Sequence, residues 1–218
     1  MKARFEIVCF DVDSTLVTIE GIDILAEGHS EVVKMTELAM SGLIPMEEVY
    51  ERRLELIRPD RKAVRDLGER YIESLVDGVE DLFGFLHSVR CDIHLVTGGI
   101  EQAVTPLAER LGIRANAVHA VPLYFDDDGG YAGFDRSAPT ARAGGKGVVC
   151  RDIRVRNKGK MAFVGDGYTD LEAMPVVDSF IGFGAVAVRD RVKEEATVWI
   201  EGADATALIP VLLETLDD

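Results

Sequence analysis

"IVCFDVDSTLV", residues 7–17, joins a short apolar run to a cluster of acidic and hydroxyl side chains. The apolar run begins at Phe5 and ends at Phe10, which is typical of a strand buried on both faces of a sheet. Asp11 and Asp13 follow at once, and burying two carboxylates is costly unless something neutralises them. This stretch therefore predicts both a central strand and a chemically special site at its end.

Similar apolar runs recur, and helical patterns lie next to most of them. The runs are residues 92–99, 161–167, 179–184 and 197–202. Such alternation predicts an α/β fold with a doubly wound, mostly parallel sheet. Two regions break the pattern. Residues 18–76 contain helical patterns only, so we expect a small helical subdomain inserted after the first strand, with the core formed by residues 1–17 and 77–218. Residues 121–134 predict a β-hairpin with a solvated acidic tip.

Composition limits the possible partners. The chain has 218 residues, is 47% apolar and carries a formal net charge of −15, which disfavours binding to nucleic acid or to an anionic membrane. No apolar run approaches the roughly 20 residues needed to span a bilayer. The cysteines (Cys9, Cys91 and Cys150) are odd in number and widely spaced, as in a reducing compartment. Since the first strand leaves no room for a signal peptide, we expect a cytoplasmic protein.

Polar groups follow three of the predicted strands. They are Asp11 and Asp13; Thr97, Gly98 and Gly99; and Asp166 and Asp170. A glycine-rich segment adds Lys146, and in parallel sheets ligands bind at the carboxyl ends of the strands. Four carboxylates with one lysine need a further cation, and an all-oxygen set without His or Cys favours Mg²⁺. The hydroxyl, the glycine amides and the lysine suit phosphate, so together these groups predict a phosphoryl-transfer site.

Each motif alone has an ordinary structural explanation, such as a helix cap or a turn. In order, however, "DVDST", "TGG", "GGKG" and "GDGYTD" resemble the four motifs of the haloacid dehalogenase-like phosphatases. The resemblance covers nearly the whole chain. It implies that the inserted helices form a cap over a Rossmann-like core. The segments "EGID", "MTELAMSG", "RRLELIRP" and "YAGFD" are similar to those of family members that hydrolyse O-phospho-L-serine.

The resemblance also implies a role for each motif residue. Asp11 would be the nucleophile that forms an aspartyl-phosphate, and Asp13 the general acid and base. Mg²⁺ would be held by Asp11, the main-chain carbonyl of Asp13 and Asp166, with Asp170 as an outer orienting group. The groups implied to hold the phosphoryl oxygens or contact the substrate are Thr97, Gly98, Gly99, Lys146 and Thr169.

The inserted helices would select the substrate. Glu20 matches the position that pairs with the ammonium group, and Arg53 the position that binds the carboxylate. Met40 and Ser41 match positions that close over the substrate. The sequence leaves open a phosphotransferase that uses another acceptor such as homoserine, a phosphatase that acts on another small phosphomonoester, and a non-catalytic sensor of serine or phosphate. It is compatible with a monomer or a homodimer.

Overall fold

The computed structural model describes residues 3–28, 30–40, 43 and 46–213. Its central sheet has six parallel strands in the order β3-β2-β1-β6-β7-β8. The strands are β1 (Ile7–Phe10), β2 (Asp92–Ile100), β3 (Val118–Val121), β6 (Met161–Gly165), β7 (Ser179–Phe183) and β8 (Val198–Ile200). β1 therefore lies at the middle of the sheet, and the predicted parallel α/β fold is confirmed.

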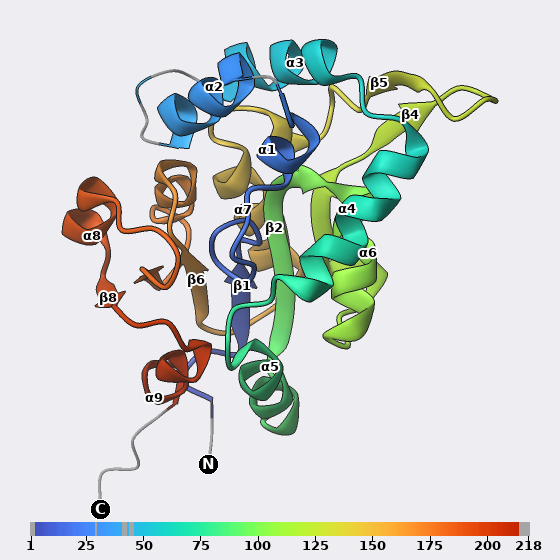
Figure 1. The fold of residues 1–218 in the computed structure, drawn as a ribbon. Coiled ribbons are helices and arrows are strands. Elements are labelled where there is room, and N and C mark those ends of the chain that lie inside the picture. Colours follow the sequence, from blue (N-terminus) through green and yellow to red (C-terminus); the bar gives the residue numbers. More distant parts are fainter. Residues whose placement is uncertain (1–2, 29, 41–42, 44–45, 214–218) are drawn as a thin grey trace, which may run out of the picture.

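Side chains of β1 alternate between two hydrophobic cores. Val8 and Phe10 belong to the core that contains residues of α5 (Val79–Ser88) and α6 (Glu101–Arg110). Ile7 and Cys9 belong to the core with residues of α7 (Gly145–Arg156) and α8 (Asp190–Glu195). Helices thus cover both faces of the sheet, as Figure 1 shows. This is why β1 reads as a continuous apolar run and not as an alternating one.

The helices between β1 and β2 are α1 (Gly21–Leu25), α2 (Ser30–Met40), α3 (Met46–Ile57) and α4 (Arg61–Glu73), followed by α5. In Figure 1, α1, α2 and α3 lie at the top of the molecule, over the end of the sheet at which β1 and β2 finish. α4 begins after the N-cap Asp60, whose side chain accepts a hydrogen bond from the main-chain N–H of Ala63. It then descends alongside α6, where Gly68 allows a close approach to the carbonyl oxygen of Ala103.

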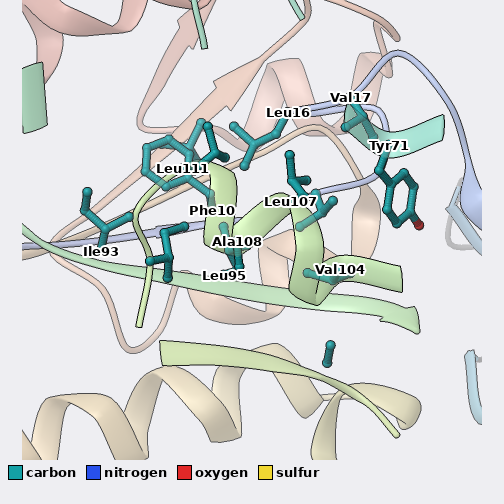
Figure 2. Packing of buried hydrophobic residues seen from close by; sticks show 14 of the residues in the cluster. Phe10, Leu16, Val17, Tyr71, Ile93, Leu95, Val104, Leu107, Ala108 and Leu111 are labelled. Carbon is teal, nitrogen blue, oxygen red and sulfur yellow. The ribbon is translucent and has the colours of Figure 1, made fainter. Parts of the chain in front are cut away.

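Tyr71, in the last turn of α4, belongs to the larger core. Its side chain is 1% exposed and clusters with residues of β1, the following loop and α6. Figure 2 shows its ring at one side of the drawn cluster, next to the labelled Val17, Leu107 and Val104. Full burial of an aromatic ring contributes several kcal/mol to folding, on the order of 2–3 kcal/mol. α4 is therefore anchored to the core even though it belongs to the inserted helical region.

Some local structure differs from the sequence prediction. Residues 118–121 form a sixth parallel strand, which sequence analysis did not predict. The segment after β6 is a 3-10 helix, Tyr168–Ala173, and not an α-helix. The predicted hairpin is present as β4 (Leu123–Phe125) and β5 (Tyr131–Phe134). The last helix within the described residues is the short α9 (Ile209–Leu212). Within the described residues, no helix has both the length and the apolar character needed to cross a bilayer.

Candidate active site

The loop after β1 directs its two carboxylates to different places. Asp11 continues the strand, and its main-chain N–H donates to the carbonyl of Val164 in β6 at 3.0 Å. The chain then turns, with the carbonyl of Val12 accepting hydrogen bonds from the N–H groups of Thr15 and Leu16. Asp13 ends up beside α1, and its Oδ1 accepts a hydrogen bond from the main-chain N–H of Gly21 at 2.6 Å. Both carboxyl groups are buried.

Ser14 marks the tightest point of this loop. Its φ angle is +54°, in the left-handed region that non-glycine residues seldom adopt. Its hydroxyl donates to Oε1 of Glu20 at 2.6 Å. The loop therefore folds back on itself, and Glu20, six positions later in the chain, comes to lie beside Ser14. Local strain of this kind clusters at functional sites.

Three carboxylates gather at the carboxyl ends of β1 and β6. Asp11, Asp166 and Asp170 each offer an oxygen, and these oxygens all lie within 4.8 Å of one another. Lys146 Nζ lies 2.8 Å from Oδ1 of Asp11 and also forms an ion pair with Asp170. The lysine is held at the start of α7, between two close-packed glycines. At Gly147, for example, a Cβ atom would lie 2.5 Å from the carbonyl oxygen of Glu172.

This cluster fits a hard divalent cation. All its donor atoms are carboxylate oxygens, and all three residues are buried. Oδ1 of Asp166 accepts a hydrogen bond from the Thr15 hydroxyl at 2.6 Å, while Arg189 forms an ion pair with the other oxygen. The donor set itself favours an oxygen-seeking ion over zinc or copper, which prefer nitrogen or sulfur ligands.

The last residues of β2, where its pairing with β3 is irregular between Val96 and Ile100, supply groups suited to an anion. The Thr97 hydroxyl accepts a hydrogen bond from the N–H of Gly99 at 3.0 Å. The carbonyl of Gly98 accepts a hydrogen bond from the Tyr50 hydroxyl of α3 at 2.9 Å. Thr97, Gly98 and Lys146 line the same pocket as Asp11. A phosphoryl group placed there would face the carboxylate of Asp11, the ammonium of Lys146 and the glycines at the end of β2.

The inserted helices contribute one acidic and one basic group to this pocket. Glu20 precedes α1 and lies 3.8 Å from Arg189, measured from carboxylate oxygen to guanidinium nitrogen. Arg53, on α3, is only 4% exposed. Its Nη1 donates to the Thr36 hydroxyl at 3.1 Å, and its guanidinium stacks 5.6 Å from the centre of the Tyr50 ring. Fixing a guanidinium in this way restricts the orientations of its planar fork within the pocket.

Burial and mutual repulsion alter the acid–base behaviour of the pocket. Burial, followed by the negative charge of Asp11, raises the pKa of Asp13 to about 6. The same two causes raise the pKa of Asp170 to about 7. Burial and the charge of Asp13 raise the pKa of Glu20 to about 8. Burial and the neighbouring Asp13 also raise the pKa of Tyr71, so its hydroxyl is protonated and acts as a donor. Clusters of perturbed carboxylates in one cleft are typical of active sites.

The pocket has about 690 Å³ of empty space, including solvent at its mouth. The predicted site residues that line it are Asp11, Asp13, Glu20, Arg53, Thr97, Gly98, Gly99, Lys146 and Thr169. Asp166 and Asp170 lie beside it, bonded to Arg189 and Lys146. Asp170 was expected in an outer position, and its carboxylate lies within the cluster itself. Ser41 and the side chain of Met40 fall outside the described residues.

Sequence analysis missed several residues of this pocket. Tyr50, Tyr71 and Thr36 come from the inserted helices, and Arg189 from the segment before α8. None lies in the four catalytic motifs, although Thr36 stands in the segment "MTELAMSG", and each meets its partner across a long stretch of sequence. Thr15 did stand in the "DVDST" motif, but its bond to Asp166 spans 151 positions. The signal in the sequence was its hydroxyl close to Asp11 and Asp13, which indicated a polar environment but not the identity of its partner.

Comparisons with known proteins agree with this geometry. The model of the haloacid dehalogenase-like hydrolases matches residues 5–178. Phosphoserine phosphatase of Homo sapiens is 41% identical over 197 residues, which is 88% of each chain. The chloroplastic phosphoserine phosphatase of Arabidopsis thaliana is 39% identical over 88% of this chain and 67% of its own length. A phosphoserine phosphatase solved as an analogue of the phospho-aspartyl intermediate has a TM-score of 0.81 and 26% identity, covering 97% of this chain and 99% of its own.

Proposed function

Because the chain belongs to the haloacid dehalogenase-like hydrolase family, we propose that it hydrolyses O-phospho-L-serine to L-serine and phosphate. One observation carries this proposal: Glu20 and Arg53 line the same pocket as Asp11 and Lys146. A phosphomonoester that also bears an ammonium and a carboxylate is complementary to that set of charges. The identity of about 40% to phosphoserine phosphatases over most of the chain supports the same substrate.

The reaction has two halves. In the first, a carboxylate oxygen of Asp11 attacks phosphorus and forms a P–O bond, while the bond from phosphorus to the serine oxygen breaks. The departing serine oxygen takes a proton from Asp13. In the second, a water molecule gives a proton to Asp13 as its oxygen bonds to phosphorus, and the bond to Asp11 breaks. One water is consumed, and Asp13 recovers its proton.

The surrounding residues stabilise and align these steps. Lys146, Thr97 and Gly98 would bind the phosphoryl oxygens, and their position in the lining of the pocket that Asp11 also lines supports this. Mg²⁺ would be held by Asp11, Asp166 and the main-chain carbonyl of Asp13, and when bound it would offset negative charge on the phosphoryl group. Asp170 stands beside this set and keeps Lys146 in position through their ion pair.

We further propose that residues 18–76 act as the cap over a core of residues 1–17 and 77–218. The two substrate-selecting groups, Glu20 and Arg53, come from this region, and the reacting groups come from the core. Met40 and Ser41 stay predicted cap contacts. A cytoplasmic location also stays a prediction, made from the spacing of the cysteines.

A phosphate-release assay over a panel of phosphomonoesters tests the assignment. The wild-type protein should favour phosphoserine, lose activity in a chelator and regain it with Mg²⁺. Asp11→Asn should abolish turnover with an unchanged circular dichroism spectrum, because the amide cannot attack phosphorus. Near-wild-type release by Asp11→Asn would refute its role as nucleophile. Product analysis with added homoserine separates hydrolysis from transfer to another alcohol, and absence of turnover on every ester would favour a sensor.

A further inference from the structure

The two oxygens of Asp13 have different surroundings. Oδ1 accepts two hydrogen bonds, from the main-chain N–H of Gly21 at 2.6 Å and from the Tyr71 hydroxyl at 2.7 Å. Among the described residues, none donates a hydrogen bond to Oδ2. Oδ2 instead lies against the last residues of β2, 3.1 Å from the position that a Cβ atom on Gly99 would occupy. Oδ2 is therefore the oxygen directed at the place where the phosphoryl group would bind.

The core fixes the Tyr71 donor. The ring is 1% exposed and belongs to the same core cluster as Val17, Val104 and Leu107; Figure 2 shows it at one side of that cluster. Its helix, α4, is in turn held close to α6 at Gly68. A buried phenol needs a hydrogen-bond partner, and Asp13 is the partner that this position provides. The hydroxyl cannot turn away without moving the core, so it holds Asp13 in one orientation.

We propose that Tyr71 is a positioning residue for the reaction. Its hydroxyl and the Gly21 N–H both donate hydrogen bonds to Oδ1 of Asp13, so that Oδ2 exchanges protons with the leaving serine oxygen and with water. This inference rests on the proposed phosphatase function. It assigns a role to a residue 58 positions away from Asp13 in the sequence and outside all four motifs. Efficient proton transfer requires such alignment, because the acid must lie within hydrogen-bond reach of the oxygen it protonates.

Gly21 makes the arrangement possible. A Cβ atom at this position would lie 2.0 Å from the Tyr71 hydroxyl oxygen and 2.8 Å from the ring carbon that bears it. Any larger residue must push the hydroxyl away from Asp13. The glycine thus serves two purposes here: its N–H donates to Oδ1, and its missing side chain leaves room for the second donor.

Tyr71→Phe removes the hydroxyl and keeps the buried ring. Losing a hydrogen bond to a charged group should lower kcat/KM for phosphoserine about tenfold to a hundredfold, through kcat more than KM. kcat/KM for p-nitrophenyl phosphate should fall much less, because p-nitrophenolate departs without being protonated and this parameter reports only the step that phosphorylates Asp11. Tyr131→Phe is the matched control: it removes a phenol hydroxyl on β5, and both esters should react as in the wild type.

Two outcomes would overturn the proposal. Equal losses on both esters would mean that Tyr71 acts only through the fold, and wild-type rates on phosphoserine would mean that it does not position Asp13. If the wild-type protein released phosphate from neither ester, the proposed function itself would be refuted, and the role of Tyr71 with it.

A second variant keeps the test independent of the stability of Tyr71→Phe. Gly21→Ala should lower kcat/KM for phosphoserine in the wild-type background by displacing the Tyr71 hydroxyl. In the Tyr71→Phe background the nearest clashing atom is gone, so the same change should cost clearly less. Strictly multiplicative losses in the double variant would contradict the inferred coupling.

Discussion

Arg53 offers a sharp test of substrate choice, because its own environment fixes the guanidinium before any ligand arrives. The side chain is 4% exposed, donates to the Thr36 hydroxyl at 3.1 Å and stacks on Tyr50. Neither contact involves the substrate. Phosphoethanolamine lacks the carboxylate of phosphoserine, so it cannot form the charge-assisted hydrogen bonds that we propose between that carboxylate and Arg53.

The magnitude follows from that contact alone. A hydrogen bond to a charged group contributes about 1.5–3 kcal/mol, and each 1.4 kcal/mol is about a factor of ten. Phosphoethanolamine should therefore have a kcat/KM about tenfold to a hundredfold below that of phosphoserine. Arg53→Ala should lower kcat/KM on phosphoserine by a comparable factor and on phosphoethanolamine much less, because the contact is already missing there.

The assay is a four-way cycle of phosphate-release measurements: wild type and Arg53→Ala, each on both esters. Arg53→Lys is the informative companion, since a single ammonium cannot reproduce the planar fork and should recover only part of the loss. Equal losses on the two esters would show that Arg53 supports the fold of the inserted helices and does not recognise the carboxylate.

Two further perturbations follow from the charges of the pocket. Lys146→Met leaves Asp11 and Asp170 buried without their shared cation, so in chelator at pH 8 the free energy of unfolding in urea should fall by about 3–5 kcal/mol. This loss should shrink toward pH 5, because the pKa of Asp170 is already raised to about 7 and its carboxyl takes up a proton there. A loss that does not depend on pH would contradict this account. Glu20, whose pKa is raised to about 8, is largely protonated at pH 7 and must ionise to pair with an ammonium. Binding of L-serine should therefore release up to about one proton at pH 7 and less at pH 9, measured by calorimetry in buffers of different ionisation enthalpy, and Glu20→Gln should abolish the release.

Much of the fold and the reacting centre could be predicted from local patterns. Asp11, Thr97 and Asp166 each follow or end a buried apolar run, and parallel strands bring their carboxyl ends to one edge of a sheet. This rule for parallel strands was enough to predict that the three side chains lie close together. The extra strand at Val118–Val121 was missed because it is short, lies at the edge and pairs only with β2.

The sequence by itself determined which chemistry is present: two carboxylates one residue apart after a buried strand, a lysine between glycines, and oxygen ligands for a hard cation. Only the tertiary structure decided how these groups are oriented. Tyr71 reaches Asp13 because α4 packs against α6, and Arg189 reaches Asp166 from the segment before α8. Such contacts depend on where whole helices come to rest, which follows from packing over the entire core and not from the residues on either side of a motif.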